Sequence, residues 1–301
     1  MNRRNWLKIA GAAAAAPVIS GADSGTFRFG VIADTHIIDG FYKGPESNEL
    51  DTQSILKSSE RLTAARAHLN ALKPALEHVF LIGDYFHDYP STDVDFYFQN
   101  KTRIDFAKEL TDGFAMPVHV GFGNHDYFVP KMTREASHEL FRRKLGVKPY
   151  YAVDHKGVKF VHLNNFLGDT WKPGSAVYEK GRGSLGLEQL EWFEAELRQG
   201  KPTFVFVHYP VGSIADVERA DFGLHPLLKK YAGNVLHVLS GHRHRWLDFA
   251  DKFGPKHTAI GATRFDPDAY LIVEIDPKKA TYELLNIGRV EWNTHYSEPW
   301  G

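Results

Sequence analysis

The 301-residue sequence contains no cysteine, which excludes disulfides, thiolate metal ligands and a catalytic thiol. A bound metal would therefore have to be held by His, Asp, Glu or Asn, and the 16 histidines make such binding plausible. The formal net charge is only −1 and no basic stripe occurs, so we expect no nucleic-acid partner. With 43% hydrophobic and 24% charged residues, the composition is that of a globular protein with a sizeable core.

The first 22 residues have the pattern of a targeting segment. The arginine pair Arg3-Arg4 precedes Trp6 and an Ala-rich apolar run, and a small-x-small site ends at Ala22. This order resembles a twin-arginine export signal, and the apolar run is shorter than the about 20 residues that a membrane-spanning helix needs. We therefore predict a signal peptide over residues 1–22, export by the twin-arginine machinery to the periplasm or beyond, and no stable membrane anchor. An ordinary amphipathic helix is the alternative.

The remaining chain, residues 23–301, is predicted to form a single α/β domain because no linker-like segment divides it. Five apolar, β-branched or aromatic runs predict buried strands, at residues 26–34, 78–84, 117–124, 202–210 and 234–242. Helical spacing of apolar residues predicts helices at residues 59–74, 95–113, 134–146 and 186–200. Residues 246–301 are expected to add short strands, at 268–276 and 281–287.

Each of the five predicted strands ends in residue types that bind metals. The residues concerned are Asp34 and His36, then Asp84, then Asn124, His125 and Asp126, then His208, and finally His242 and His244. In open α/β sheets ligands bind beyond the carboxyl ends of the strands, so we expect the five groups to meet at one sheet edge.

The donor types indicate which metals could bind. Residues i and i+2 of an extended chain point the same way, so the pairs Asp34/His36 and His242/His244 can each present two ligands together. Oxygen and imidazole donors without sulfur suit Zn, Fe or Mn. The set is too rich for one tetrahedral ion and favours two metals that share a bridging carboxylate. For any motif taken alone, a polar turn or an exposed segment is the competing interpretation.

The five motifs, in this order, resemble those of the calcineurin-like metallophosphoesterases. They are Asp34-x-His36, Gly83-Asp84, Gly123-Asn124-His125-Asp126, His208 and Gly241-His242-x-His244, within residues 27–245. The resemblance implies a layered α/β/β/α sandwich with two divalent ions, of Mn, Fe, Zn or Mg, at the carboxyl ends of the strands. It also implies hydrolysis of a phosphomonoester or phosphodiester of a small molecule, by attack of a metal-bridged hydroxide.

The resemblance further implies a role for each residue. Asp34, His36 and His244 would bind one metal. Asn124, His208 and His242 would bind the other, with Asp84 as the bridge. His125 would face the phosphate as a general acid or oxyanion stabiliser, and Asp126 would hold His125 in place.

Three further residues are predicted to contact the substrate, namely His87, Asn164 and Arg243. Many relatives carry Asp or Asn where His87 falls. The purple acid phosphatase branch has a metal-binding Tyr there and lacks the His of the first motif, so that branch is disfavoured. Two other functions stay open: a non-catalytic binding protein on the same fold, and a nuclease-type relative.

Overall fold

The protein was analysed as a computed structural model that describes residues 25–219 and 221–292. The predicted signal peptide, residues 1–22, lies outside the described residues. The described residues form two β-sheets and seven α-helices. None of the described helices is both long and apolar enough to cross a membrane.

The first sheet has the strand order β11-β10-β1-β2-β3. Its strands are β11 (Thr281–Leu284), β10 (Tyr270–Asp276), β1 (Phe27–Ile32), β2 (His78–Leu81) and β3 (Val118–Val120). The last three run parallel, whereas β10 pairs with β1 in antiparallel register and β11 pairs antiparallel with β10. The carboxyl ends of β1, β2 and β3 therefore point to the same side of the molecule.

The second sheet has the order β4-β5-β6-β7-β9-β8. Its strands are β4 (Tyr151–His155), β5 (Val158–Leu163), β6 (Thr203–Val207), β7 (Val235–Ser240), β9 (Lys256–Ala259) and β8 (Leu247–Asp248). The central strands β5, β6, β7 and β9 are parallel, and the edge strands β4 and β8 are antiparallel to their neighbours.

Aromatic side chains join the two sheets face to face. The ring of Phe29 lies 5.0 Å from the rings of both Phe160 and Phe204, centroid to centroid. The ring of Phe80 lies 4.6 Å from that of Phe206 and 4.7 Å from that of Phe160. Such pairs contribute about 0.5–1.5 kcal/mol each beyond the burial of their area. This aromatic layer fixes the position of one sheet relative to the other.

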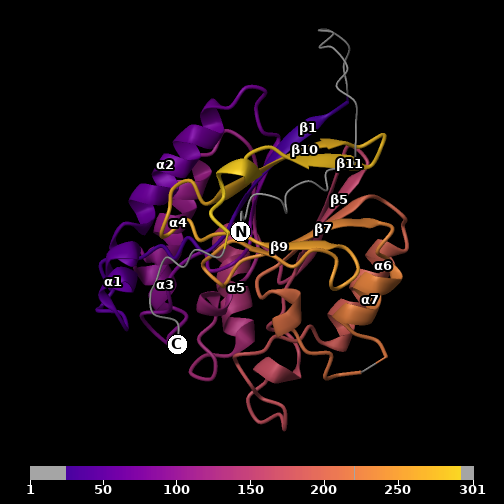
Figure 1. Cartoon of the computed structure of the whole chain (residues 1–301). Coiled ribbons are helices and arrows are strands. Elements are labelled where there is room, and N and C mark those ends of the chain that lie inside the picture. Colours follow the sequence, from indigo (N-terminus) through magenta and orange to yellow (C-terminus); the bar gives the residue numbers. More distant parts are fainter. Residues whose placement is uncertain (1–24, 220, 293–301) are drawn as a thin grey trace, which may run out of the picture.

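Helices cover the outer faces of the sheets (Figure 1). They are α1 (Glu49–Leu56), α2 (Ser58–Ala71), α3 (Phe96–Gln99), α4 (Arg103–Asp112), α5 (Arg134–Leu145), α6 (Leu187–Leu197) and α7 (Leu224–Lys230). Helices α1, α2 and α4 lie on one side of the molecule, and α6 and α7 lie on the other. The predicted layered α/β/β/α class is therefore confirmed.

Two details differ from the sequence-based expectation. The single helix expected over residues 95–113 is divided into α3 and α4, because Thr102 starts a new helix and its backbone N–H donates to the carboxylate of Asp105 at 2.9 Å. The five metal-binding groups were expected at the edge of one sheet, but they follow strands of two different sheets. They still meet, because the aromatic layer holds the carboxyl ends of both sheets together.

Candidate metal centre

The loops that follow β1, β2 and β7 bend sharply to bring their polar side chains together. Nine non-glycine residues in the described part of the chain have positive φ angles. Five of them are candidate ligands, namely Asp34, His36, Asp84, His242 and His244, with φ between 45° and 70°. Such backbone is costly for residues with a side chain and persists where surrounding structure enforces it, often at functional sites.

The first group of candidate ligands contains Asp34, His36, Asp84 and His244, whose ligand atoms all lie within 4.8 Å of one another. The Nε2 atoms of His36 and His244 are only 3.2 Å apart. Oδ2 of Asp84 lies 3.3 Å from Nε2 of His36, and Oδ1 of Asp34 lies 3.5 Å from Nε2 of His244. All four residues are buried. This convergence of oxygen and imidazole donors suits a divalent cation.

The second group contains Asp84, His208 and His242, again with ligand atoms within 4.8 Å. Oδ2 of Asp84 lies 3.2 Å from Nε2 of His208, and Oδ1 of Asn124 lies 3.1 Å from the same nitrogen. Asp84 is therefore common to both groups, as a bridging carboxylate would be.

Two observations test whether these residues fit a cation. Oδ2 of Asp84 is buried and has no hydrogen-bond donor among the described residues, so a carboxylate oxygen is left for another positive partner. Nδ1 of His208 lies 2.9 Å from the carbonyl oxygen of Ile82 and donates to it, which leaves the Nε2 lone pair facing the cluster. Burial opposes charge on His208, but the negative charge of Asp84 outweighs burial and raises the pKa of His208 to about 9. The negative charge of Asp84 therefore attracts positive charge to Nε2 of His208, and a cation bound there would take the place of the proton.

Two glycines allow the loops to approach this closely. A Cβ atom at Gly123 would lie 2.1 Å from the backbone nitrogen of Asp84, and one at Gly241 would lie 2.5 Å from Oδ2 of Asp34. The loop after β7 is also tied to the loop after β1, because the backbone N–H of His242 donates to both carboxylate oxygens of Asp34 at 3.0 Å. The glycines of these motifs therefore serve close backbone approach.

His125 lies beside the cluster on the short 3₁₀ turn η1 (Asn124–Asp126), and its side chain is 28% exposed. Its Nδ1 lies 2.7 Å from Oδ1 of Asp88, a residue that the sequence analysis did not single out. Burial opposes charge on the imidazole, but the negative charge of Asp84 and the hydrogen bond to Asp88 raise the pKa of His125 to about 8. The ring is thereby oriented with Nε2 directed away from Asp88.

The prediction that Asp126 holds the imidazole of His125 is wrong. The Asp126 carboxylate accepts hydrogen bonds from backbone N–H groups, at 2.7 Å from Gly123, 3.1 Å from Tyr85 and 3.3 Å from Phe86. It therefore fastens the loop after β3 to the loop after β2, and Asp88 takes the place that was expected for Asp126.

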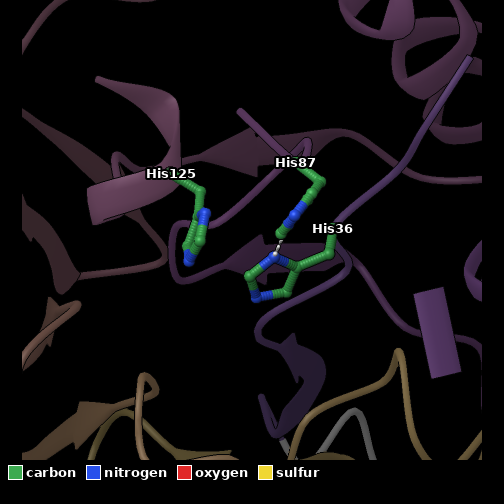
Figure 2. Close-up of side chains that lie close together, drawn as sticks. All are labelled: His36, His87 and His125. Carbon is green, nitrogen blue, oxygen red and sulfur yellow. Dashed lines mark hydrogen bonds between the residues drawn. The ribbon is translucent and has the colours of Figure 1, made fainter. Parts of the chain in front are cut away.

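His87 also has a different role from the predicted substrate contact. Its Nδ1 lies 3.1 Å from Nδ1 of His36 (Figure 2). Its Nε2 lies 3.3 Å from Oε1 of Glu46. The His87 ring stacks on that of His125 with a centroid distance of 4.8 Å. Hydrogen bonding from His87 is the main cause that lowers the pKa of Glu46 to about 2. Both ring nitrogens of His87 are thus engaged by protein groups, and His87 orients the ring of His36.

Of the other two predicted substrate contacts, the structure contradicts one. The Asn164 amide nitrogen donates to the Tyr127 hydroxyl at 2.7 Å, and its oxygen accepts from the backbone N–H of Phe166 at 3.1 Å. Asn164 is fully buried, and these two hydrogen bonds stabilise the loop that follows β5. The guanidinium of Arg243 donates to Oγ of Ser213 at 3.0 Å, and a substrate contact by this half-buried residue stays a prediction.

Comparisons with known proteins agree with this geometry. The family model for the calcineurin-like phosphoesterases matches residues 27–246 of the chain. None of the curated proteins searched matches it. A dimetal phosphatase from Danio rerio is similar in structure, with 18% identity and a TM-score of 0.58 over 82% of this chain and 92% of the other.

A purple acid phosphatase from the seeds of yellow lupin, Lupinus luteus, has 16% identity and a TM-score of 0.51. That match covers 88% of this chain but only 52% of the lupin protein. At such identities the likeness concerns the fold alone. The family match covers most of the sequence and includes all five motifs, so the chain belongs to the calcineurin-like phosphoesterase family and is a metal-dependent phosphoric ester hydrolase.

Proposed function

We propose that this protein is an exported phosphoesterase with a dinuclear metal centre, and that it hydrolyses an ester of a small phosphorylated molecule. The observation that carries the proposal is the position of Asp84, which belongs to two ligand groups at once. Asp34, His36 and His244 would hold one ion, and Asn124, His208 and His242 would hold the other.

The chain's own residues supply the remaining chemistry. When bound, two divalent ions would activate water and neutralise the charge of the phosphoryl oxygens. Nδ1 of His125 faces the Asp88 carboxylate at 2.7 Å, so the opposite nitrogen, Nε2, carries the proton that can be donated to the departing alkoxide. His125 lies on the same turn as Asn124, which keeps this donor next to the metal ligands.

The test separates metal binding from catalysis. Purified wild-type protein is expected to contain about two divalent ions per chain by elemental analysis. His208→Asn should lose metal, whereas His125→Asn should keep the wild-type metal content and lose most of its turnover. Equal loss of metal in both variants would refute the assignment of His125.

The same assays address the alternatives. Initial rates on p-nitrophenyl phosphate and bis-p-nitrophenyl phosphate, with Mn, Fe, Zn or Mg, distinguish a monoesterase from a diesterase. A protein that binds two metals but turns over neither compound would support the non-catalytic binding protein. The nuclease alternative predicts cleavage of nucleic acid, which the net charge of −1 disfavours.

Export is part of the proposal, and the arrangement of Arg3, Arg4 and the apolar run up to Ala22 supports it. The expected location is the bacterial periplasm or the exterior, reached by the twin-arginine machinery. Replacing both arginines by lysine should retain the precursor inside the cell, as judged by fractionation and the mass of the mature chain. An unchanged location in that variant would refute this route.

A further inference from the structure

A pocket of about 520 Å³ opens directly beside the candidate metal centre. Asn124, His125 and Asp88 line the end that belongs to the centre. Residues 127–131, together with Trp171, Lys180, Gly181 and Tyr209, form the rest of its wall. A molecule whose phosphorus atom lies at the centre would therefore extend its remaining part into this pocket. We name it the lysine pocket after Lys131 and Lys180, which line it from the two loops.

The lysine pocket carries an excess of positive charge. Within the described part of the chain, neither Lys131 nor Lys180 forms an ion pair with a carboxylate. Asp88 is the single acidic residue among the described residues that line the pocket, and its carboxylate is engaged with His125 at 2.7 Å. Two ammonium groups on one cavity favour an anionic occupant, because an anion accepts charge-assisted hydrogen bonds from them.

Both ammonium groups are held near the pocket wall. Nζ of Lys180 donates to the carbonyl oxygen of Val129 at 3.1 Å and lies 5.3 Å from the ring centroid of Trp171. Nζ of Lys131 lies 4.7 Å from the ring centroid of Phe128. An ammonium group has three N–H donors, so each lysine retains donors for a ligand.

Part of the pocket wall is apolar, because Phe128, Val129 and Pro130 line it next to the lysines. Such a surface suits a carbon skeleton, whereas the lysines and the residues of the centre suit charged groups. The pocket thus combines residues of the candidate metal centre, an apolar surface and two ammonium groups.

We propose that the lysine pocket selects organic bisphosphates, in which a second phosphoryl group, separated from the first by a carbon skeleton, reaches Lys131 and Lys180. This inference rests on the proposed function, because it places the scissile phosphoryl group at the metal centre. It assigns the two lysines to specificity and gives them no part in the chemical step.

The experiment uses a series of α,ω-alkanediol bisphosphates with two to six carbons and the matching monophosphates. For at least one spacer length, wild-type protein is expected to show a KM about tenfold or more below that of the monophosphate, with a similar kcat. In the double variant Lys131→Met/Lys180→Met this preference should disappear, since each charge-assisted contact corresponds to about tenfold in affinity. The KM for p-nitrophenyl phosphate should change less than twofold.

Two control variants make the result specific. Lys172→Met removes an exposed lysine from the same segment that does not line the pocket, and it should keep the preference. The double variant Lys131→Arg/Lys180→Arg retains both positive charges and should keep most of the preference for the bisphosphate. The proposal is overturned if no spacer length is preferred, or if the methionine double variant keeps the preference.

Failure of this proposal is distinguishable from failure of the proposed function. A wild-type protein that hydrolyses p-nitrophenyl phosphate without preferring any bisphosphate would refute the lysine pocket alone. A wild-type protein that hydrolyses no ester would refute the function. Calorimetric titration of metal-loaded protein with the same bisphosphates would then decide whether the lysines bind them, and an equal affinity of the methionine double variant would refute the pocket as well.

Discussion

The hydrogen bond between His125 and Asp88 gives a sharp test of how the imidazole of His125, the proposed general acid, is held. Replacing Asp88 by Asn keeps an oxygen acceptor opposite Nδ1 but removes the negative charge. A hydrogen bond to a charged group contributes about 1.5–3 kcal/mol. The Asp88 side chain is 52% exposed, so solvent screening favours the lower end of that range. At about 1.4 kcal/mol per factor of ten, we expect kcat to fall about tenfold.

The assay combines steady-state kinetics on p-nitrophenyl phosphate with elemental analysis of each variant. Because Asp88 belongs to neither group that shares Asp84, Asp88→Asn should keep the wild-type metal content. The KM for this small substrate should change little. A loss of metal in parallel with the loss of rate would show that Asp88 acts on the ligands and not on His125.

The matched control is Asp126→Asn. The Asp126 carboxylate accepts three backbone N–H groups, and an asparagine amide can present an NH₂ group to them in place of an oxygen. We therefore expect the melting temperature to fall more in Asp126→Asn than in Asp88→Asn, because the Asp88 side chain is half exposed and an asparagine there can still accept from His125. The reasoning is refuted if Asp88→Asn retains full kcat while Asp126→Asn loses kcat at unchanged stability.

Three further outcomes are expected. His87→Phe should weaken metal binding about 10- to 100-fold in a metal titration, because the bond that orients His36 is lost; an unchanged affinity would contradict that role. Chelation of divalent ions should lower the melting temperature and re-addition of Mn should restore it, since saturation at 100 times Kd stabilises by about 2.7 kcal/mol; no shift would argue against tight binding. Burial lowers the pKa of His162 and His237 to about 3, so the unfolded chain binds protons that the folded chain does not between pH 6.5 and 3. As the pH falls through this range, the free energy of unfolding should decrease by up to about 1.4 kcal/mol per pH unit for each histidine. Urea unfolding at pH 7, 6 and 5 measures this decrease, and an equal free energy of unfolding at the three pH values would contradict it.

The candidate ligands could be read from the sequence because each stands at a fixed place relative to a strand. Apolar runs mark the strands, and parallel strands send their carboxyl ends to one side. Asp34 and His36 follow β1, and His242 and His244 follow β7, each pair with the i and i+2 spacing. The expectation that each pair lies on extended chain is wrong, because all four residues have left-handed backbone with φ between 45° and 70°. The places of the ligands after the strands could therefore be predicted from the sequence, but the local backbone that aims them could not.

The residues that orient these side chains by hydrogen bonds could not be predicted from the sequence in the same way. Glu46 lies in the segment between β1 and α1, about forty residues from His87, and no periodic pattern relates the two. Asp88 reaches His125 because its own backbone has φ of 54°, which turns the chain immediately after His87. Such contacts depend on the conformation of irregular loops, which is set by tertiary packing rather than by local propensity.

The position of His87 shows why a motif does not fix a role. An aspartate at this position would place a negative charge beside His36, close to the buried carboxylate of Asp84. In this chain a neutral imidazole occupies that place and passes the contact on to Glu46, whose side chain is 23% exposed. The carboxylate that faces His125 stands one residue later, at Asp88. The negative charges of Glu46 and Asp88 thus lie further out, where water solvates them at lower cost, while His36 and His125 each keep an oriented partner.

We expect His87→Asp to lower the metal affinity of the centre more than His87→Asn does, because only the aspartate adds a charge next to Asp84. Metal affinity measured for the two variants at the same pH tests that order, and a tighter-binding aspartate variant would reverse the argument.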